Sequence, residues 1–255
     1  ASLLEQKQRV ESLYGESHNI SAPARFSVST QRYPFSEDAF LKLLQQTDEN
    51  RFHFTIKEAG MDAVIDDVYD HRADIGVIFL TELTEKIVGR LLDTRNLMFC
   101  PLASVAPCIY VRWGHPLAGR EAVDEAELLG YPYVDFEHEQ GVAADFSEEY
   151  HLLSLKKPAK CISVNNRATM MNVLSHTDAF TSGSGLLVES LANWPVTSVP
   201  LASNDLVRIG WIQAKNAKLS PLAETFLELL KQSIEESIEF TRSLHESQCR
   251  FEHTN

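Results

Sequence analysis

The sequence lacks the short motifs that mark many catalytic and nucleotide-binding sites. It contains no G-x-S-x-G, no H-E-x-x-H, no P-loop and no G-x-G-x-x-G. Its nine histidines are scattered without the spacing of metal ligands, and no pair of carboxylates stands out as an acid–base couple. We therefore expect neither an enzyme nor a resident metal or cofactor.

Long apolar runs and clustered basic residues are also absent. No apolar run approaches the roughly 18–20 residues that cross a bilayer, and the first residues carry no basic end followed by an apolar block. The chain has 23 Lys and Arg against 36 Asp and Glu, a net charge of −13. Proteins that grip a phosphate backbone need clustered Lys and Arg, so we expect this segment itself to contact neither membranes nor DNA.

Cysteine is scarce. The four cysteines, Cys100, Cys108, Cys161 and Cys249, are widely spaced and form no C-x-x-C. This pattern favours reduced thiols, and hence a cytoplasmic protein, over a disulfide framework or a zinc site. A redox pair of Cys100 and Cys108 is the alternative; packing is the first interpretation, because a free cysteine is usually a small buried hydrophobe.

The first part of the chain alternates strand and helix signals. Residues 26–29 and 52–57 alternate as half-buried strands, Ser36 followed by two acids indicates a helix start, and residues 64–69 have helical spacing. Residues 75–80 form a continuous apolar run, which is typical of a parallel strand covered on both faces. The pattern β-α-β-α-β predicts an open α/β lobe.

The middle of the chain repeats this plan. Strands are expected at residues 108–112, 131–134, 161–164, 178–181 and 196–201, with helices at 124–129, within 137–150, and from Asn166. A last helix opens at Pro221, and the tail from His245 is expected to be polar and frayed. The segments 97–103 and 207–212 are predicted to be crossing strands that join two lobes.

Candidate ligand contacts follow from the geometry of such sheets, in which ligands bind beyond the carboxyl ends of the strands. The residues at these ends are Ser29, Thr30, Gln31, Gly60, Met61, Phe136, Gln140, Gly141 and Val142, with Ser182 in a Gly-Ser turn. In the alternative interpretation Ser29 and Thr30 only cap a helix, and the turn at 181–185 is a plain turn.

Four segments in register resemble LysR-type transcriptional regulators. Residues 72–77 (RADIGV) resemble G-x-D-x-(A/G)-(I/V), and residues 108–118 (CIYVRWGHPLA) resemble LVxxxxHPLA. Residues 127–134 (ELLGYPYV) are similar to dL…xPfI, and residues 219–226 (LSPLAETF) are similar to the closing LSPAxxxF. The resemblance covers roughly residues 24–235.

The resemblance implies an effector-binding domain with two Rossmann-like lobes joined by two crossing strands, similar to a type 2 periplasmic binding protein. Its lobes would comprise residues 23–99 plus 205–240 and residues 100–204. Residues 1–22 would be the stub of a linker helix and a loop, and residues 241–255 a C-terminal tail.

The implied function is sensing of a small-molecule effector, a carboxylate or an aromatic compound, in the cleft between the lobes. Family members assemble as dimers or tetramers, pairing antiparallel, and DNA would be bound only through an N-terminal domain that this sequence does not contain. The family's ligand loops correspond to Ser29–Gln31, Gly60–Met61 and Gln140–Val142. Two departures concern the effector's chemistry: Met61 replaces a common Thr, and residues 176–179 replace a Gly-rich turn. A solute-binding protein of a transport system is the alternative on the same architecture.

Overall fold

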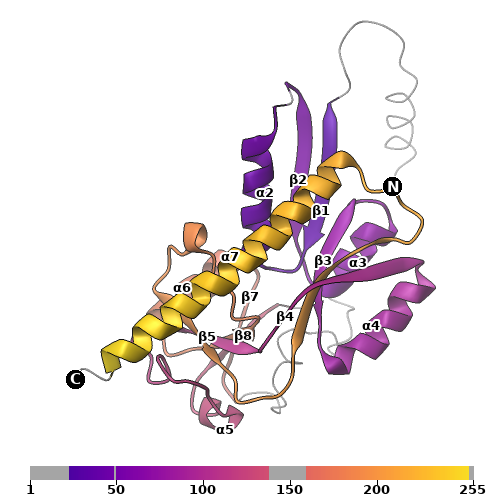
Figure 1. The fold of residues 1–255 in the computed structure, drawn as a ribbon. Helices are drawn as coiled ribbons and strands as arrows, with labels where there is room; N and C mark the ends of the chain where they lie inside the picture. Colours follow the sequence, from indigo (N-terminus) through magenta and orange to yellow (C-terminus); the bar gives the residue numbers. More distant parts are fainter. Residues whose placement is uncertain (1–22, 49, 138–158, 253–255) are drawn as a thin grey trace, which may run out of the picture.

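Two α/β lobes make up the part of the chain that the computed structural model describes, residues 23–48, 50–137 and 159–252. Figure 1 shows the lobes side by side, with two long strands between them and one long helix across both. Within these residues no helix is long and apolar enough to cross a membrane.

The first lobe is a five-stranded sheet with the strand order β2-β1-β3-β10-β4. Its elements are β1 (Ala24–Thr30), α2 (Pro34–Gln46), β2 (Phe52–Glu58), α3 (Met61–Tyr69), β3 (Ile75–Leu80), α4 (Glu82–Thr94), β4 (Leu97–Val105), β10 (Val207–Ala214) and α7 (Pro221–Glu252). Strands β1, β2 and β3 are parallel, and β10 is antiparallel to β3 and β4. Every residue of β3 is buried, so the prediction of a parallel strand covered on both faces is confirmed.

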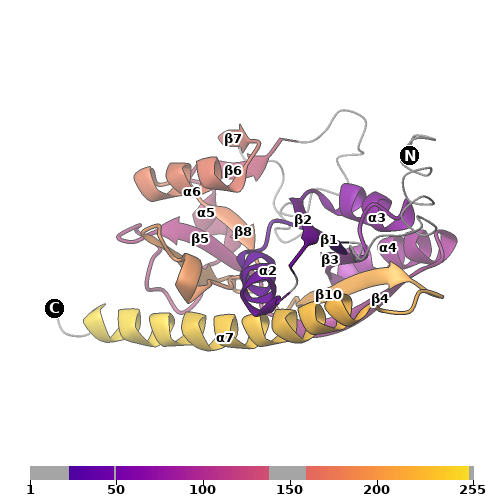
Figure 2. The same cartoon turned by 90° about the horizontal axis from the view of Figure 1, so that it is seen from above.

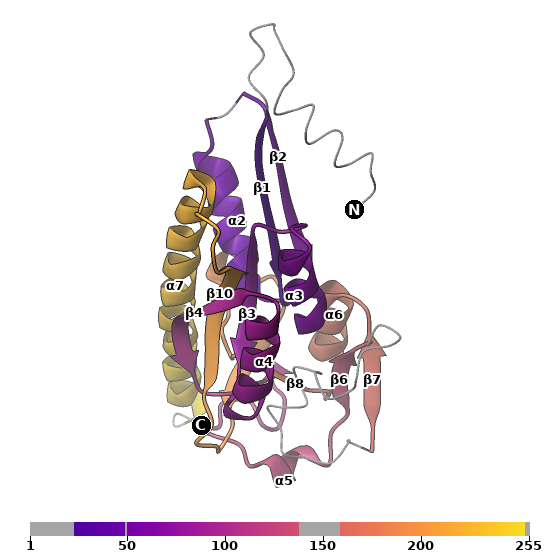
Figure 3. The ribbon, with the colours of Figure 1, turned by 90° about the vertical axis from the view of Figure 1, so that its right-hand side faces the viewer.

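Two helix layers cover this sheet. Helices α2 and α7 lie on one face, while α3 and α4 lie on the other (Figure 3). The predicted order β-α-β-α-β is correct, but α4 was not predicted. The predicted start of α2 at Ser36 is wrong, since the helix begins at Pro34 with Tyr33 as the N-cap residue. Proline is tolerated there because the first helical N–H has no partner within the helix.

The second lobe is built on a three-stranded sheet, β8-β5-β9, and a two-stranded parallel sheet, β6-β7. Its elements are β5 (Cys108–Arg112), α5 (Glu125–Leu128), β6 (Tyr133–Phe136), β7 (Cys161–Val164), α6 (Arg167–His176), β8 (Thr181–Gly183), the 3-10 helix η3 (Glu189–Leu191) and β9 (Val196–Pro200). A bridge between Tyr133 and Phe180 joins the two sheets. The helix predicted within 137–150 lies almost entirely outside the described residues.

Strands β4 and β10 are the predicted crossing pair, and they pair antiparallel from Leu97–Ala214 to Val105–Val207. The two backbones approach most closely near Gly210, where the register shifts. A Cβ atom at Gly210 would lie 2.5 Å from the Cys100 carbonyl oxygen, so only glycine fits without movement of the backbone. The predicted lobe boundary at residue 99 falls inside β4, and the division of the chain into domains remains a prediction.

Helix α7 is the longest element and runs along both lobes (Figure 2). Its first half packs Phe226, Leu230 and Ile234 into the core of the first lobe. Farther along, Thr241 accepts a hydrogen bond from the Leu187 N–H at 2.9 Å, and His245 Nε2 donates to the Ser198 carbonyl at 2.7 Å. The prediction of a frayed tail is therefore wrong for residues 245–252, which continue α7, and residues 253–255 lie outside the described residues.

Candidate functional site

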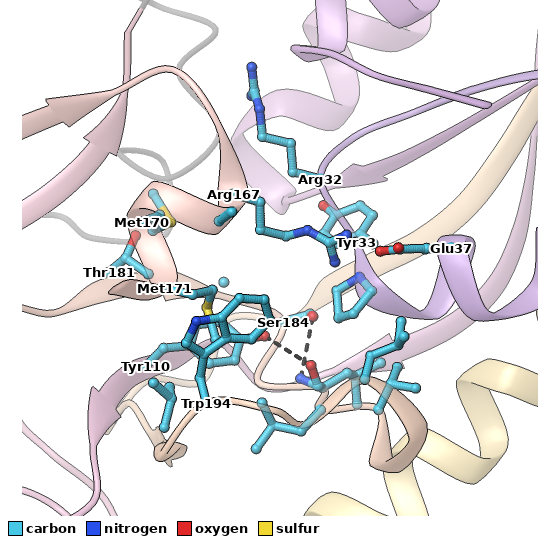
Figure 4. A pocket seen from close by; sticks show the side chains of 18 of the residues that line it. Arg32, Tyr33, Glu37, Tyr110, Arg167, Met170, Met171, Thr181, Ser184 and Trp194 are labelled. Atoms are coloured by element: carbon cyan, nitrogen blue, oxygen red, sulfur yellow. Dashed lines mark hydrogen bonds and ion pairs between the residues drawn. The ribbon is translucent and has the colours of Figure 1, made fainter. Parts of the chain in front are cut away.

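A cavity of about 540 Å3 lies between the two lobes. Both lobes contribute to its wall (Figure 4). The first lobe supplies Arg32, Tyr33, Pro34, Glu37, Glu58 and Phe79. The second lobe supplies Tyr110, Phe136, Asn166, Arg167, Ala168, Met170, Met171 and Val196, residues 181–184, 186–188 and 191–194.

The start of α2 presents the first lobe's side of the cavity. Pro34 begins the helix, so Tyr33 stands just before it at the end of the β1–α2 loop. The Tyr33 ring stacks on Phe35, with centroids 4.8 Å apart and planes 11° apart, and it also contacts Phe79. These contacts hold an aromatic ring at the wall in one orientation.

The start of α6 presents the second lobe's side. The side chain of Asn166 caps the helix by accepting a hydrogen bond from the Thr169 N–H at 2.8 Å. The cap fixes the first turn, where Arg167 and Ala168 line the cavity. Met170 and Met171 follow on the same helix, and Trp194 lies nearby with its indole N–H donating to Asn172 at 3.1 Å.

Two arginines reach across from one lobe to the other. Arg167 of the second lobe forms ion pairs with Glu37 and Glu58 of the first lobe, and Figure 4 shows it extending toward Glu37. The guanidinium of Arg32, from the first lobe, lies over the Phe136 ring of the second, 4.0 Å from its centroid. These contacts couple the cavity wall to the relative position of the lobes.

Burial raises the pKa of two acidic groups in the cavity wall. Burial raises the pKa of Glu58 above its ordinary value, and Arg167 offsets this effect only in part while Glu37 adds to it. Burial also raises the pKa of Tyr110 strongly, so its hydroxyl stays protonated. The Tyr110 hydroxyl donates to the Leu186 carbonyl at 3.3 Å.

One polar group in the wall has no partner among the described residues. The Thr181 side chain is 4% exposed, and its hydroxyl makes no hydrogen bond to any residue that the structure describes. Buried hydroxyl groups are normally hydrogen-bonded. The Thr181 hydroxyl oxygen itself has almost no accessible surface, so it faces protein atoms rather than the open cavity.

Three of the predicted ligand contacts instead make hydrogen bonds within the first lobe, although the Gln31 side-chain NH2 group has no partner among the described residues. Ser29 donates to Asp67 at 2.8 Å, the Thr30 hydroxyl donates to the Gln31 carbonyl at 2.8 Å, and the Gln31 side-chain oxygen accepts from the Phe79 N–H at 2.7 Å. All three side chains are buried, and none lines the cavity. Their polar groups hold the β1–α2 loop in place.

The remaining predicted contacts divide into three groups. Phe136 and Ser182 line the cavity. Gly60 is the N-cap residue of α3, and Met61 is the first residue of that helix and is buried in the core; neither lines the cavity. Gln140, Gly141 and Val142 lie outside the described residues. Of the seven predicted contacts that lie within the described residues, two line the cavity.

Several cavity residues were missed, notably Tyr110, Arg167, Thr181 and Trp194. Arg167 carried a usable signal, because it directly follows the Asn166 cap at the start of a predicted helix. Thr181 carried a weaker one, since it stands beside Ser182 in the Gly-Ser turn. Nothing in the local sequence of Tyr110 or Trp194 indicates their position.

Among the described residues, Cys100, Cys108 and Cys161 are thiols rather than disulfide partners. Burial raises the pKa of Cys108 to about 12 and raises that of Cys100 as well, so both thiols resist conversion to the reactive thiolate. Cys108 is buried. Among the described residues no group of three or more His, Cys, Asp or Glu could hold a metal ion.

Comparison with known proteins places this architecture in a family. The family model described as the LysR substrate binding domain matches residues 41–235. No curated protein sequence matches the chain.

Among solved structures, the effector-binding domain of QuiR in complex with shikimate is similar, with a TM-score of 0.56 and 15% identity over 84% of this chain and 99% of that one. The oxidised form of Corynebacterium glutamicum OxyR has a TM-score of 0.56 and 13% identity over 94% of this chain and 73% of that one. HinK, a LysR family transcriptional regulator from Pseudomonas aeruginosa, has a TM-score of 0.55 and 14% identity over 91% of this chain and 76% of that one.

Proposed function

Because the chain belongs to the LysR substrate-binding domain family, we propose that it is the effector-sensing domain of a LysR-type transcriptional regulator, with its effector bound between the two lobes. The observation that carries this proposal is the cavity whose wall both lobes share. The similar effector-binding domain of QuiR holds shikimate. Both the family model and the similar regulators support this role over solute transport.

An effector in the cavity contacts both lobes and therefore acts on their relative position. A molecule between Tyr33 of the first lobe and Trp194 of the second contacts both lobes at once. It shifts the equilibrium between lobe positions only if it contacts one position better than the other. The ion pairs of Arg167 with Glu37 and Glu58 cross the same gap, so a ligand that moves them alters the lobe angle.

The output of this domain passes to other parts of the regulator. We expect the chain to associate with itself as a dimer or tetramer, and the DNA contacts to be made by a separate domain. The net charge of −13 supports DNA binding by a separate domain, since a chain with this charge repels the phosphate backbone.

A thermal-shift screen of small molecules tests the proposal. A compound that binds the folded chain raises its melting temperature with concentration. Each compound that does so is then tested on Ala168→Phe, which places a ring in the cavity, and on Ala126→Phe, an exposed alanine on α5 outside the cavity. We expect Ala168→Phe to abolish the shift and Ala126→Phe to keep it. Compounds that stabilise both variants equally would contradict the proposed site.

A further inference from the structure

We infer that Arg167 and its two glutamates, Glu37 and Glu58, form a latch between the lobes, and that the cavity opens on the latch side by rotation about the opposite side of α2. The inference rests on the proposed function, because it concerns how an effector reaches the cavity between the lobes. It follows from the positions of the charged and the buried contacts between the lobes.

The latch joins the start of α6 to the first lobe. Arg167 is the first residue of α6, and the Asn166 side chain caps that helix, so the backbone at Arg167 is fixed in the second lobe. The guanidinium pairs with Glu37 of α2 and, at 3.1 Å, with Glu58 at the end of β2. A guanidinium has five N–H donors in one plane, so a single arginine holds both carboxylates. The latch separates only if the start of α6 moves away from α2 and β2.

A second set of contacts, which we call the tie, joins the lobes on the other side of α2. Asp38 of α2 accepts hydrogen bonds from Ser190 of η3 at 2.8 Å and from Ser233 of α7 at 2.7 Å. Leu186 and Val188, which follow β8 of the second lobe, are buried in the apolar core of the first lobe. Separating the tie would therefore expose apolar surface to water, which is unfavourable.

The latch and the tie lie on opposite sides of α2 and differ in exposure. Figure 2 shows α6 on one side of α2 and α7 on the other, and Figure 3 shows the same order. The latch side chains are 24% (Arg167), 38% (Glu37) and 30% (Glu58) exposed, whereas Leu186 and Val188 of the tie are buried. Ion pairs that water reaches contribute little to stability, and buried apolar contacts contribute more. The latch is therefore the side that opens first.

Opening at the latch gives access to the cavity while the tie stays closed. All three latch residues line the cavity, so their separation widens the wall between α2 and α6. Rotation about the tie leaves the pairing of β4 with β10 and the contacts of α7 in place. An effector that contacts one lobe position better than another thus acts on the closing and opening of the latch.

Alkylation of a cysteine placed in the cavity wall measures this opening. Ser184 and Ser182 line the cavity and are buried, so Ser184→Cys and, as a second reporter, Ser182→Cys should react with N-ethylmaleimide at a rate set by opening. Mass spectrometry in a reducing buffer follows each cysteine, with the exposed Cys161 as internal standard. Arg167→Gln is expected to accelerate labelling at the reporter position about 2- to 10-fold and Glu37→Gln about 2-fold, with no change at Cys161.

Two controls separate opening at the latch from general loosening. Arg120→Gln removes an exposed ion pair with Glu127 inside the second lobe, and it should leave the labelling rate unchanged. Hydrogen exchange at the Leu187 amide, which donates to Thr241, should stay slow in Arg167→Gln because the tie is intact. Equal labelling rates in Arg167→Gln and Arg120→Gln would overturn the latch. Faster exchange at Leu187 in Arg167→Gln would overturn rotation about the tie.

The latch and the proposed site can fail separately. Glu37→Gln added to Arg167→Gln should not accelerate labelling further, since Glu37 joins the lobes through Arg167; an additive increase would overturn this arrangement. No effector takes part in these measurements, so their failure leaves the proposed site intact. Stabilising compounds that Ala168→Phe does not block would contradict the site and leave the latch intact.

Discussion

Helix α7 fastens the second lobe to the first, and one hydroxyl on it gives a sharp test. The Leu187 N–H donates to the Thr241 hydroxyl at 2.9 Å, and both residues are buried, at 9% and 7% exposure. Thr241→Val keeps the shape of the side chain but removes the acceptor, which leaves a buried N–H without its partner. Such a loss costs about 1–3 kcal/mol. The free energy of unfolding should fall by that amount.

Urea unfolding with a matched control measures this cost. Thr225→Val is the control, because the Thr225 hydroxyl donates to the Pro221 carbonyl of the same helix in an exposed position. We expect the control to change the free energy of unfolding by less than about 0.5 kcal/mol. Hydrogen exchange at the Leu187 amide should accelerate in Thr241→Val only. Equal stability of the two variants, with Leu187 still protected, would refute the fastening role of α7.

Three further predictions concern charge and packing. Glu58→Gln should raise the free energy of unfolding at neutral pH by less than about 1 kcal/mol. Because the folded pKa of Glu58 is raised, this advantage should vanish as the pH falls through that pKa. An advantage that persists in urea melts below pH 4 would contradict this prediction. Gly210→Ala should lower the free energy of unfolding by about 1–3 kcal/mol, because the added Cβ overpacks against Cys100. Gly89→Ala in α4, where a Cβ has open space, should raise it by about 0.5–1 kcal/mol. Similar melting temperatures for the two variants would contradict close packing of the crossing strands at Gly210. Burial raises the pKa of Asp38, but hydrogen bonds from Lys42 and two serines outweigh burial and lower the pKa overall. The stability that Asp38 adds over Asp38→Asn is therefore present above about pH 4 and is lost as the pH falls through the folded pKa. A difference in stability between the two proteins that does not shrink in acid would rule this out.

The fold was largely predictable because its strands carry strong local signals. The apolar run Ile75–Leu80 and the strand Cys161–Val164 lie where the sequence predicts them. Helix α4 was missed, although Thr81 and Thr84 form a capping box at its start. The predicted cap at Ser36 failed because that hydroxyl is instead buried against Thr30, a contact between different elements that no local pattern reveals.

The site was less predictable, for a physical reason. Ser29 stands at the carboxyl end of a strand, as a ligand contact should, but Asp67 from α3 occupies its hydroxyl. The actual wall joins Tyr110, Arg167 and Trp194, which are far apart in sequence and meet only once the lobes have folded and packed together. Pairing between lobes is a tertiary property, and a single sequence read locally carries little information about it.

The central claim, that an effector binds in the cavity between the lobes, is tested most directly by fluorine NMR. The chain has three tryptophans: Trp194 lines the cavity, while Trp113 is 58% exposed and does not line it. With fluorotryptophan incorporated and each resonance assigned by a Trp→Phe variant, a stabilising compound should shift the resonance of Trp194 and leave that of Trp113 in place. A compound that stabilises the chain and shifts Trp113 but not Trp194 would contradict the account.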